Sequence, residues 1–469
     1  MSKRPDLPEG SRPAGNTLLQ AALCPSCRQA VKNTESSITC SNCSRTYPRL
    51  GEIPVLLTDP DAYLDSCRQQ LELLRHEAEE TVRLIENELA AADVLPITRA
   101  RGQAAIGGIL GQLNDVEALV GPLLPAEGGE RVGRAPDQRA SATLEYLPYL
   151  HRDWGASSDV DGENERALST LEHVRNGRAL GRTLILGAGA CRLAYDLHHR
   201  DPSTEIVALD LDPVLFSAAQ AVTCGGAVSI CEANWEICEV ERSTAERTLT
   251  APDGPVSRDR FHLVIADALD PPFAPQSVDT VVTPWFIDQA PEDIRDLIST
   301  LYSLIVPGGL WLNLGPLRYE PEVPIGLRFA REEVFDLAAR VGFRMDRWRT
   351  DTAPYLVSSL NGRGRIEWVL AFAATKLEAP SIEVPEDGPP AWLIFHHLPI
   401  PTFPGQSAFW SETPALEGVV SSIDGNRTLD DIARLVAERM GRSDLSMSQI
   451  RGAVRQCLVE VHPEGHSPD

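Results

Sequence analysis

The sequence lacks any apolar run long enough to cross a membrane. None of its 469 residues lies in a stretch approaching the ~18 consecutive apolar residues of a membrane span, and the N-terminal segment has no apolar core of the kind a signal peptide carries. Positive charge is also scarce, because 43 Lys and Arg stand against 67 Asp and Glu for a net charge of −24. This imbalance disfavours binding to phosphate backbones or anionic membranes. We therefore expect a cytoplasmic protein that binds neither nucleic acid nor membrane.

The cysteines do not resemble the disulfide framework of a secreted protein. Four of the ten form two CxxC pairs separated by twelve residues, and the other six are scattered. Each pair can direct two thiolates at one ion, which predicts the closed tetrahedral sulfur site of a structural Zn²⁺. The predicted ligands are Cys24, Cys27, Cys40 and Cys43. Because the protein supplies all four ligands, chelation should unfold this module.

Two amphipathic helices are expected between residues 61 and about 124. Apolar residues there recur three and four apart, as at Leu71, Leu74, Ala78, Val82, Ile85 and Leu89. A stripe of this kind is typical of a packing surface. The Gly- and Arg-rich stretch 127–139 indicates a linker.

From residue 182 onward, β-type apolar runs alternate with helical stretches. This alternation predicts a doubly wound α/β domain with a mostly parallel sheet. The expected strands cover residues 183–186, 205–209, 261–266, 278–283 and 310–314.

A cofactor loop is predicted after the first of these strands. Gly187 and Gly189 follow the apolar run and precede a helix, which lets the backbone approach a ligand closely. The second strand ends at Asp210, where nucleotide-binding sheets bind ribose hydroxyls, and the third is followed by Asp267. These strand ends meet at one edge of a parallel sheet. The glycine turn alone does not distinguish a dinucleotide site from an S-adenosylmethionine site.

Later segments resemble class I methyltransferases. The turn Pro307-Gly308-Gly309 is similar to the one that leads into their fifth strand. TPWFIDQA at 283–290 resembles the FFIDTA motif of carnosine N-methyltransferases, and WLNLGPLRY at 311–319 resembles their WINLGPLLYH run. RDW at 152–154 and ER at 165–166 resemble two elements upstream of their glycine loop. The similarity covers residues 145 to 376 and implies an S-adenosylmethionine-dependent methyltransferase.

The resemblance also implies roles for individual residues. Arg152 would hold the methionine carboxylate of the cofactor, Gly187 would pack against it, and Gly189 belongs to the same loop. Asp210 would bind ribose and Asp267 would lie beside adenine. The catalytic candidates, placed at the methyl acceptor, are Asp288, Glu320 and Tyr355.

A physical argument supports the candidate Asp288. An imidazole that attacks a methyl group must present one nitrogen as a free lone pair, and a carboxylate on the other N–H fixes that tautomer.

The sequence departs from the family pattern near the acceptor. Glu320 replaces the His of LLYH, Cys191 replaces a glycine after the loop, and a second tyrosine expected near residues 365–368 is absent. Carnosine itself is therefore in doubt as the acceptor. DPPF at 270–273 matches a signature of amino methyltransferases that act on adenine and glutamine, but it follows the third strand rather than the fourth. We interpret it as a loop with a backbone fixed by proline.

Two smaller modules flank the predicted catalytic domain. YPRLGEIPVLL at 47–57 resembles the end of zinc ribbons that accompany methyltransferases, and residues 419–433 resemble winged-helix modules that bind precursor peptides. The expected division is a zinc ribbon at 1–58, a helical connector at 59–142, a Rossmann-like methyltransferase domain at 143–378 and a winged-helix-like domain at 379–469.

The predicted function is N-methylation of a histidine-like imidazole in a small molecule, dipeptide or peptide, with a precursor peptide or protein as a further partner of the C-terminal module. The alternatives are a peptide- or protein-modifying methyltransferase with a different acceptor, and a noncatalytic scaffold that binds the cofactor.

Overall fold

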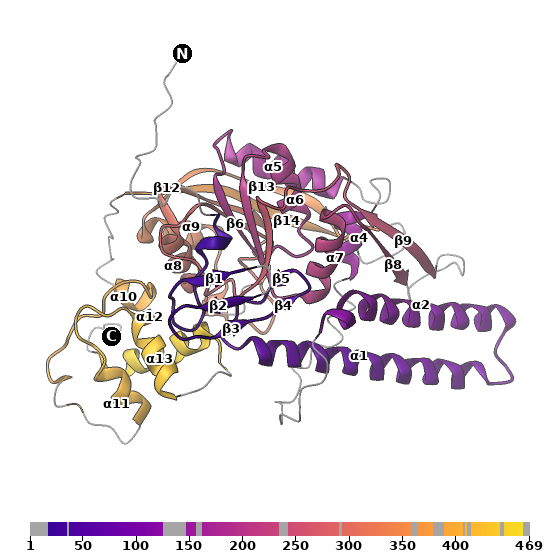
Figure 1. Cartoon of the computed structure of the whole chain (residues 1–469), viewed down its shortest axis with the longest axis horizontal. Coiled ribbons are helices and arrows are strands. Elements are labelled where there is room, and N and C mark those ends of the chain that lie inside the picture. The colour runs from indigo at the N-terminus through magenta and orange to yellow at the C-terminus, as the bar shows by residue number, and fades with distance from the viewer. Residues whose placement is uncertain are drawn as a thin grey trace, which may run out of the picture.

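The computed structural model describes residues 17–34, 37–124, 147–155, 162–233, 243–289, 293–358, 364–378, 389–406, 409, 414–440 and 445–462. A seven-stranded sheet forms its centre, in the order β10-β7-β6-β11-β12-β14-β13 (Figure 1). The first five strands are parallel, and β14 is antiparallel to both of its neighbours. This is the Rossmann-like methyltransferase fold that the sequence predicts.

All five strands expected from the sequence are present. They are β6 (Arg182–Leu186), β7 (Glu205–Asp210), β10 (Phe261–Ile265), β11 (Val278–Pro284) and β12 (Ile305–Gly315). The two strands β13 (Phe343–Tyr355) and β14 (Arg365–Lys376) complete the sheet. β11, for example, has six buried residues among its seven, and only Asp279 is partly exposed. Burial of this kind explains why the strands of a parallel sheet appear in the sequence as near-continuous apolar runs.

Helices cover both faces of the sheet. The apolar core of one face includes α5 (Glu163–Arg175), α6 (Arg192–Arg200) and α7 (Pro213–Thr223), and the core of the other includes α8 (Ile294–Leu304) and α9 (Arg331–Val341). Carboxylates cap two of these helices: Asp212 accepts from the amides of Val214 and Leu215 at 2.8 Å. Asp293 accepts from the amide of Arg295 at 2.9 Å. These caps satisfy amides that have no partner within the first helical turn.

The expected helical pair is confirmed as α1 (Pro60–Leu89) and α2 (Pro96–Val120), followed by the short helix η2 (Gly121–Leu123). The pair projects from the sheet in Figure 1, and its inner face packs with α4 (Leu147–Trp154) and α7. A hairpin of β8 (Ala227–Ala233) and β9 (Thr244–Thr250), which the sequence did not predict, also packs on α2. The expected linker at 127–139 lies outside the described residues.

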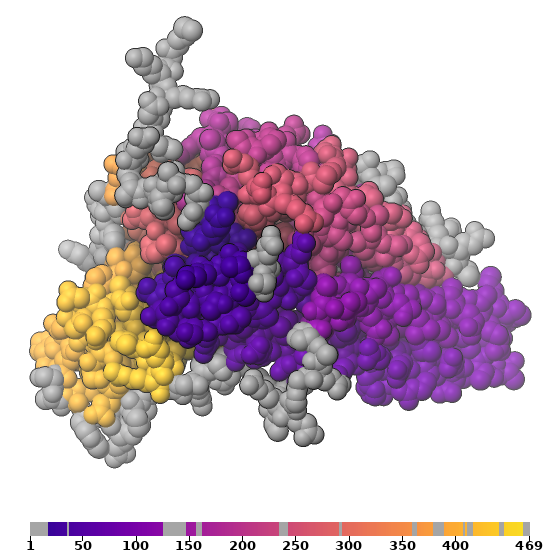
Figure 2. Space-filling model, in the orientation of Figure 1, coloured from indigo at the N-terminus to yellow at the C-terminus, as the bar shows by residue number. Residues whose placement is uncertain are grey.

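The N-terminal module is built from short elements around the four cysteines. They are η1 (Leu19–Ala21), β1 (Val31–Asn33), β2 (Ile38–Cys40), β3 (Thr46–Tyr47), β4 (Arg49–Leu50) and β5 (Ile53–Pro54). The module lies against the part of the chain that forms the central sheet (Figures 1 and 2). The amide of Leu56 donates to the carbonyl of Ile265 at 2.8 Å, and that of Leu23 donates to Pro272 at 2.7 Å. The chain after β5 therefore lies beside the edge strand β10.

The C-terminal segment forms a separate apolar cluster of helices. They are α10 (Ala391–Ile394), α11 (Pro414–Val420), α12 (Leu429–Met440) and α13 (Met447–Val461). Among the described residues of this segment, the only β structure is a bridge between Pro399 and Thr428. The helices agree with the sequence, while the winged-helix assignment stays a prediction.

Within the described part of the chain, no helix combines the length and hydropathy that crossing a membrane requires.

Candidate active site

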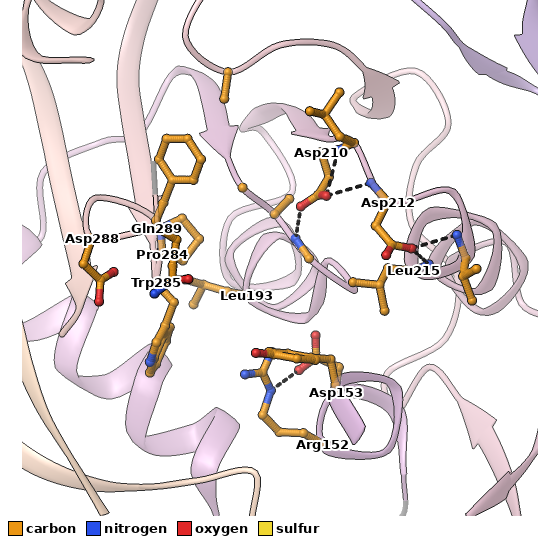
Figure 3. A pocket seen from close by; sticks show the side chains of 18 of the residues that line it. Arg152, Asp153, Leu193, Asp210, Asp212, Leu215, Pro284, Trp285, Asp288 and Gln289 are labelled. Carbon is orange, nitrogen blue, oxygen red and sulfur yellow. Dashed lines mark hydrogen bonds and ion pairs between the residues drawn. The ribbon is translucent and has the colours of Figure 1, made fainter. Parts of the chain in front are cut away.

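A cavity of about 1370 Å³ lies at the carboxyl ends of the parallel strands. Open α/β sheets bind their ligands at this edge. Every residue predicted to bind the cofactor or to face the acceptor lines it: Arg152, Gly187, Gly189, Asp210, Asp267, Asp288, Glu320 and Tyr355. Figure 3 shows Asp210 and Asp212 on one side of this space, Trp285 and Asp288 on the opposite side, and Arg152 between them. The fold thus brings together residues that are up to 203 positions apart in the chain, from Arg152 to Tyr355.

The glycine loop takes a backbone conformation that favours glycine. Gly187 has φ +66° and Gly189 has φ +54°. A Cβ on Gly187 would lie 2.3 Å from the Phe286 ring, whereas one on Gly189 would meet nothing within 4 Å. Gly187 is therefore required both by its φ and by the close approach of Phe286.

Asp210 organises this loop. One of its oxygens accepts from the amide of Gly189 at 2.7 Å, and the other accepts from Leu211 at 2.7 Å and from Asp212 at 2.9 Å. Burial raises the pKa of its carboxyl group, and these three amides lower it in part. Asp210 thus fixes the turn and still borders the cavity.

Asp267 stands at the end of β10. Its Oδ1 accepts from the amide of Leu269 at 2.8 Å, and burial raises its pKa. The sequence placed both Asp210 and Asp267 correctly at strand ends, but not Asp212, which also lines the cavity. The pKa of Asp212 is raised to about 7, mainly by burial. Its signal in the sequence was the Asp-Pro pair that opens α7.

Arg152 lies in a buried pocket of carboxylates and aromatic rings. Its Nε donates to Asp153 at 2.6 Å and lies 3.7 Å from Glu163. The guanidinium carbon lies 5.1 Å from the centre of the Tyr149 ring and 5.6 Å from that of Tyr355. Such contacts hold a guanidinium in place through cation–π attraction. The hydroxyl groups of the two tyrosines are 3.1 Å apart.

Glu163 is a cavity residue that sequence reasoning missed. It is 4% exposed, and neither of its carboxylate oxygens has a hydrogen-bond partner among the described residues. Burial raises its pKa to about 7, although Arg152 lowers it. The nearest sequence signal was the ER element at 165–166, two positions away.

Asp288 has one oxygen satisfied and one free. Its Oδ2 accepts from the amide of Arg318 at 2.9 Å, and its Oδ1 is buried without a hydrogen-bond partner among the described residues. Burial raises its pKa to about 6. An unpaired acceptor inside a cavity can accept a hydrogen bond from the N–H of a ligand.

Charged side chains surround the cavity near Asp288. Arg365 pairs with Glu367 at 2.7 Å, and the indole of Trp285 donates to Glu367 at 3.0 Å. Arg318 and Glu320 belong to the loop after β12 and are exposed. The region therefore combines two arginines with carboxylates beside the Trp285 ring.

The four predicted metal ligands form a cluster. The sulfur atoms of Cys24, Cys27, Cys40 and Cys43 all lie within 4.8 Å of one another. Those of Cys27 and Cys40 are 3.4 Å apart, and those of Cys24 and Cys43 are 3.7 Å apart. Four thiolates at these distances suit tetrahedral Zn²⁺. None of the four lines the cavity.

Comparison with known proteins gives one family match. The carnosine N-methyltransferase family model matches residues 131–361, just under half of the chain, and this part contains every predicted cavity residue. A carnosine N-methyltransferase of Drosophila melanogaster is 36% identical over 93 residues, which are 19% of this chain and 20% of that protein. One from Rattus norvegicus is 32% identical over 71 residues, or 14% of this chain and 18% of that protein. The chain thus spans about a fifth of these relatives.

Solved structures show weaker likeness. A methyltransferase in complex with the Trm112 methyltransferase activator of Haloferax volcanii is 14% identical, with a TM-score of 0.34 over 50% of this chain and 98% of that chain. A phosphoethanolamine N-methyltransferase of Haemonchus contortus, solved with S-adenosylhomocysteine, is 13% identical, with a TM-score of 0.33 over 51% of this chain and 58% of that chain.

Proposed function

We propose that the chain is an S-adenosylmethionine-dependent N-methyltransferase that acts on an imidazole nitrogen of a histidine-like small molecule, dipeptide or peptide. The observation that carries this proposal is the single cavity that contains all eight predicted cofactor and acceptor residues. The family match over residues 131–361 supports the same conclusion.

The cavity residues suit the chemical groups of this cofactor. Arg152 would bind the methionine carboxylate, and the buried acids Asp153 and Glu163 beside it complement the cationic ammonium group. Asp210 would accept from the ribose hydroxyls, and Asp267 from the adenine amino group. S-adenosylmethionine, when bound, supplies an electrophilic methyl group on its sulfonium.

The acceptor would be oriented by Asp288. The free Oδ1 would accept from one imidazole N–H, which leaves the other nitrogen as a lone pair. The new N–C bond would form as the sulfonium C–S bond breaks and S-adenosylhomocysteine leaves. The ring would then be cationic, and the Asp288 carboxylate would stabilise it and accept the N–H proton. Methyl transfer is an in-line displacement, so positioning should dominate the rate. Tyr355, whose ring lies beside that of Trp285, would form part of the aromatic lining of the cavity.

Glu320 marks the difference from the family. Where the carnosine enzymes have a histidine, this chain has a carboxylate near the cavity, and Arg318 precedes it by two residues. We therefore propose an imidazole acceptor that differs from carnosine in the part distant from the ring. A peptide that carries histidine, recognised with help from the C-terminal module, is the second candidate. The cysteine cluster would hold a structural Zn²⁺.

The test is an acceptor screen with methyl-labelled S-adenosylmethionine. Free histidine, carnosine, other histidine dipeptides and a peptide extract are incubated with the protein, and the product that gains one methyl group is identified. Asp288→Asn should lower the rate of transfer by about tenfold or more. Asp336→Asn, which alters a 57% exposed side chain on α9, is the matched control and should leave it unchanged. Labelling of no imidazole by an enzyme that binds the cofactor would refute the proposed acceptor class.

A further inference from the structure

We propose that Asp270 is a positioning residue for the cofactor site, through which the two flanking modules hold the adenine-binding loop in place. We call residues 266–273 the adenine loop. The inference rests on the proposed function, in which Asp267 of this loop faces the adenine amino group.

The adenine loop is a tight unit. Ala266, Asp267 and Leu269 line the cavity, while Asp270 does not. The amide of Leu269 donates to the Asp267 carboxylate at 2.8 Å, and the amide of Asp270 donates to the Asp267 carbonyl at 3.2 Å. A shift of Asp270 would therefore move the Asp267 carboxylate with it.

Three arginines from outside the catalytic domain converge on Asp270, which is 8% exposed. Arg434 of α12 contacts its Oδ1 at 2.6 Å, Arg28 of the cysteine module at 3.4 Å, and Arg451 of α13 at 3.5 Å. Arg451 also donates to the Leu269 carbonyl at 3.2 Å. Both flanking modules thus contact the same carboxylate directly behind the cavity wall.

The arginines are themselves fixed from the other side. Asp430 pairs with Arg434 at 3.0 Å and with Arg451 at 2.7 Å. Arg451 is 2% exposed, so this network lies in the interior. Buried ion pairs contribute little net stability because of the cost of desolvation, and their best-supported use is to specify one arrangement of the chain. Here the arrangement specified is the position of the adenine loop.

Backbone hydrogen bonds from the cysteine module add to this restraint. Leu56 donates to the carbonyl of Ile265, one residue before the loop, and Leu23 donates to Pro272 near its end. The loop is therefore held at its start, in the middle and near its end by parts of the chain outside the catalytic domain.

A matched pair of arginines in the C-terminal module allows a clean test. Arg434 joins that module to the adenine loop, whereas Arg455 joins it to α8 through Asp296 and Asp293. Arg434→Gln and Asp270→Asn should weaken binding of S-adenosylhomocysteine by about tenfold or more in calorimetry. Arg455→Gln loosens the same module without touching the loop, and it should bind S-adenosylhomocysteine as the unaltered protein does.

Two further readouts separate positioning from general destabilisation. The kcat of Asp270→Asn at saturating cofactor should stay close to that of the unaltered enzyme, while the KM for the cofactor rises. The loss of affinity should also be smaller for S-inosylhomocysteine, whose base lacks the amino group that Asp267 would bind. Arg434→Gln leaves Asp270 paired with Arg28 and Arg451, and so serves as the measurement if Asp270→Asn fails to fold.

The outcomes are distinguishable. Failure of the unaltered protein to bind S-adenosylhomocysteine would overturn the proposed function and this inference together. Normal binding by Asp270→Asn and Arg434→Gln, or an equal loss in Arg455→Gln, would overturn only the role of Asp270.

Discussion

Replacing Asp288 with asparagine should make the protein more stable and less active. The carboxyl is 4% exposed, and burial raises its pKa from 3.8 to about 6. A shift of about two units corresponds to about 3 kcal/mol by which the native fold disfavours the ionised form. The amide substitute keeps an oxygen for the Arg318 N–H but carries no charge. We therefore expect the free energy of unfolding of Asp288→Asn at pH 8 to exceed that of the unaltered protein by up to about 3 kcal/mol.

The sign of this effect depends on pH. Because the native pKa is the higher one, the native state holds the proton more tightly than the unfolded state does. The penalty is absent below about pH 4, grows as pH rises from about 4 to about 6, and is complete above that range. Urea denaturation at pH 4.5 and at pH 8 measures it. The stability gain of Asp288→Asn over the unaltered protein should be larger at pH 8 than at pH 4.5.

Activity should change in the opposite direction. The charged hydrogen bond between the imidazole N–H and the Asp288 carboxylate would be lost, which costs about 1.5–3 kcal/mol of binding to the transition state. The value of kcat/KM for the imidazole acceptor should therefore fall by about 10- to 150-fold. Affinity for S-adenosylhomocysteine should not change. A variant that is less stable at pH 8, or that retains full turnover, would refute the reasoning, since a purely structural aspartate gives the first result and a bystander gives the second.

Three other changes test the site. Gly187→Ala should lower the free energy of unfolding by about 1–3 kcal/mol and remove most of the cofactor affinity, because its Cβ would meet Phe286. Gly162→Ala is the control, since Gly162 has φ +68° but open space around it, and it should show only the smaller backbone cost. Thermal denaturation and calorimetry measure the two effects. Arg152→Met should destabilise the fold by about 3–5 kcal/mol, because the buried carboxylates of Asp153 and Glu163 lose their cationic partner. Adding Glu163→Gln to this variant should restore part of the lost stability in the same denaturation assay. Metal analysis should find about one Zn²⁺ per chain, and removal of the metal by a chelator should unfold the cysteine module. Hydrogen exchange of the backbone amides in this module measures the unfolding. Metal-free protein whose amides there remain protected from exchange would contradict the prediction.

The sequence located the parts of the site that depend on local chemistry. Gly187 and Gly189 were predicted because a tight turn after a buried strand requires glycine, and Asp210 and Asp267 because parallel strands end at one edge. The cysteine cluster was predicted from spacing alone, since each CxxC turn is itself a local structure.

The residues missed by the sequence reach the site through long-range packing. Glu163 and Tyr149 come from helices upstream of the glycine loop, and no strand end or turn marks them. The hairpin strand β9 was missed because most of its side chains are polar and only Leu249 is fully buried, which leaves no clear alternation. The long strand β13 is likewise exposed along most of its length and is specified by pairing with β14.

The motif at 270–273 shows how a local reading can be right and incomplete. The sequence indicates a loop with a backbone fixed by proline, and the structure has a loop there, which begins at Asp270. What the sequence could not give is that Arg28 and Arg434, 242 positions before and 164 positions after Asp270, contact the same carboxylate. The predicted catalytic domain at 143–378 contains neither arginine. Expressed alone, it would keep the eight predicted cofactor and acceptor residues. It would lose the cavity residues of α1 and α2, and the buried Asp270 carboxylate would be left without its cationic partners. We therefore expect the isolated domain to bind S-adenosylhomocysteine more weakly than the full chain, and equal affinity of the two would contradict the argument.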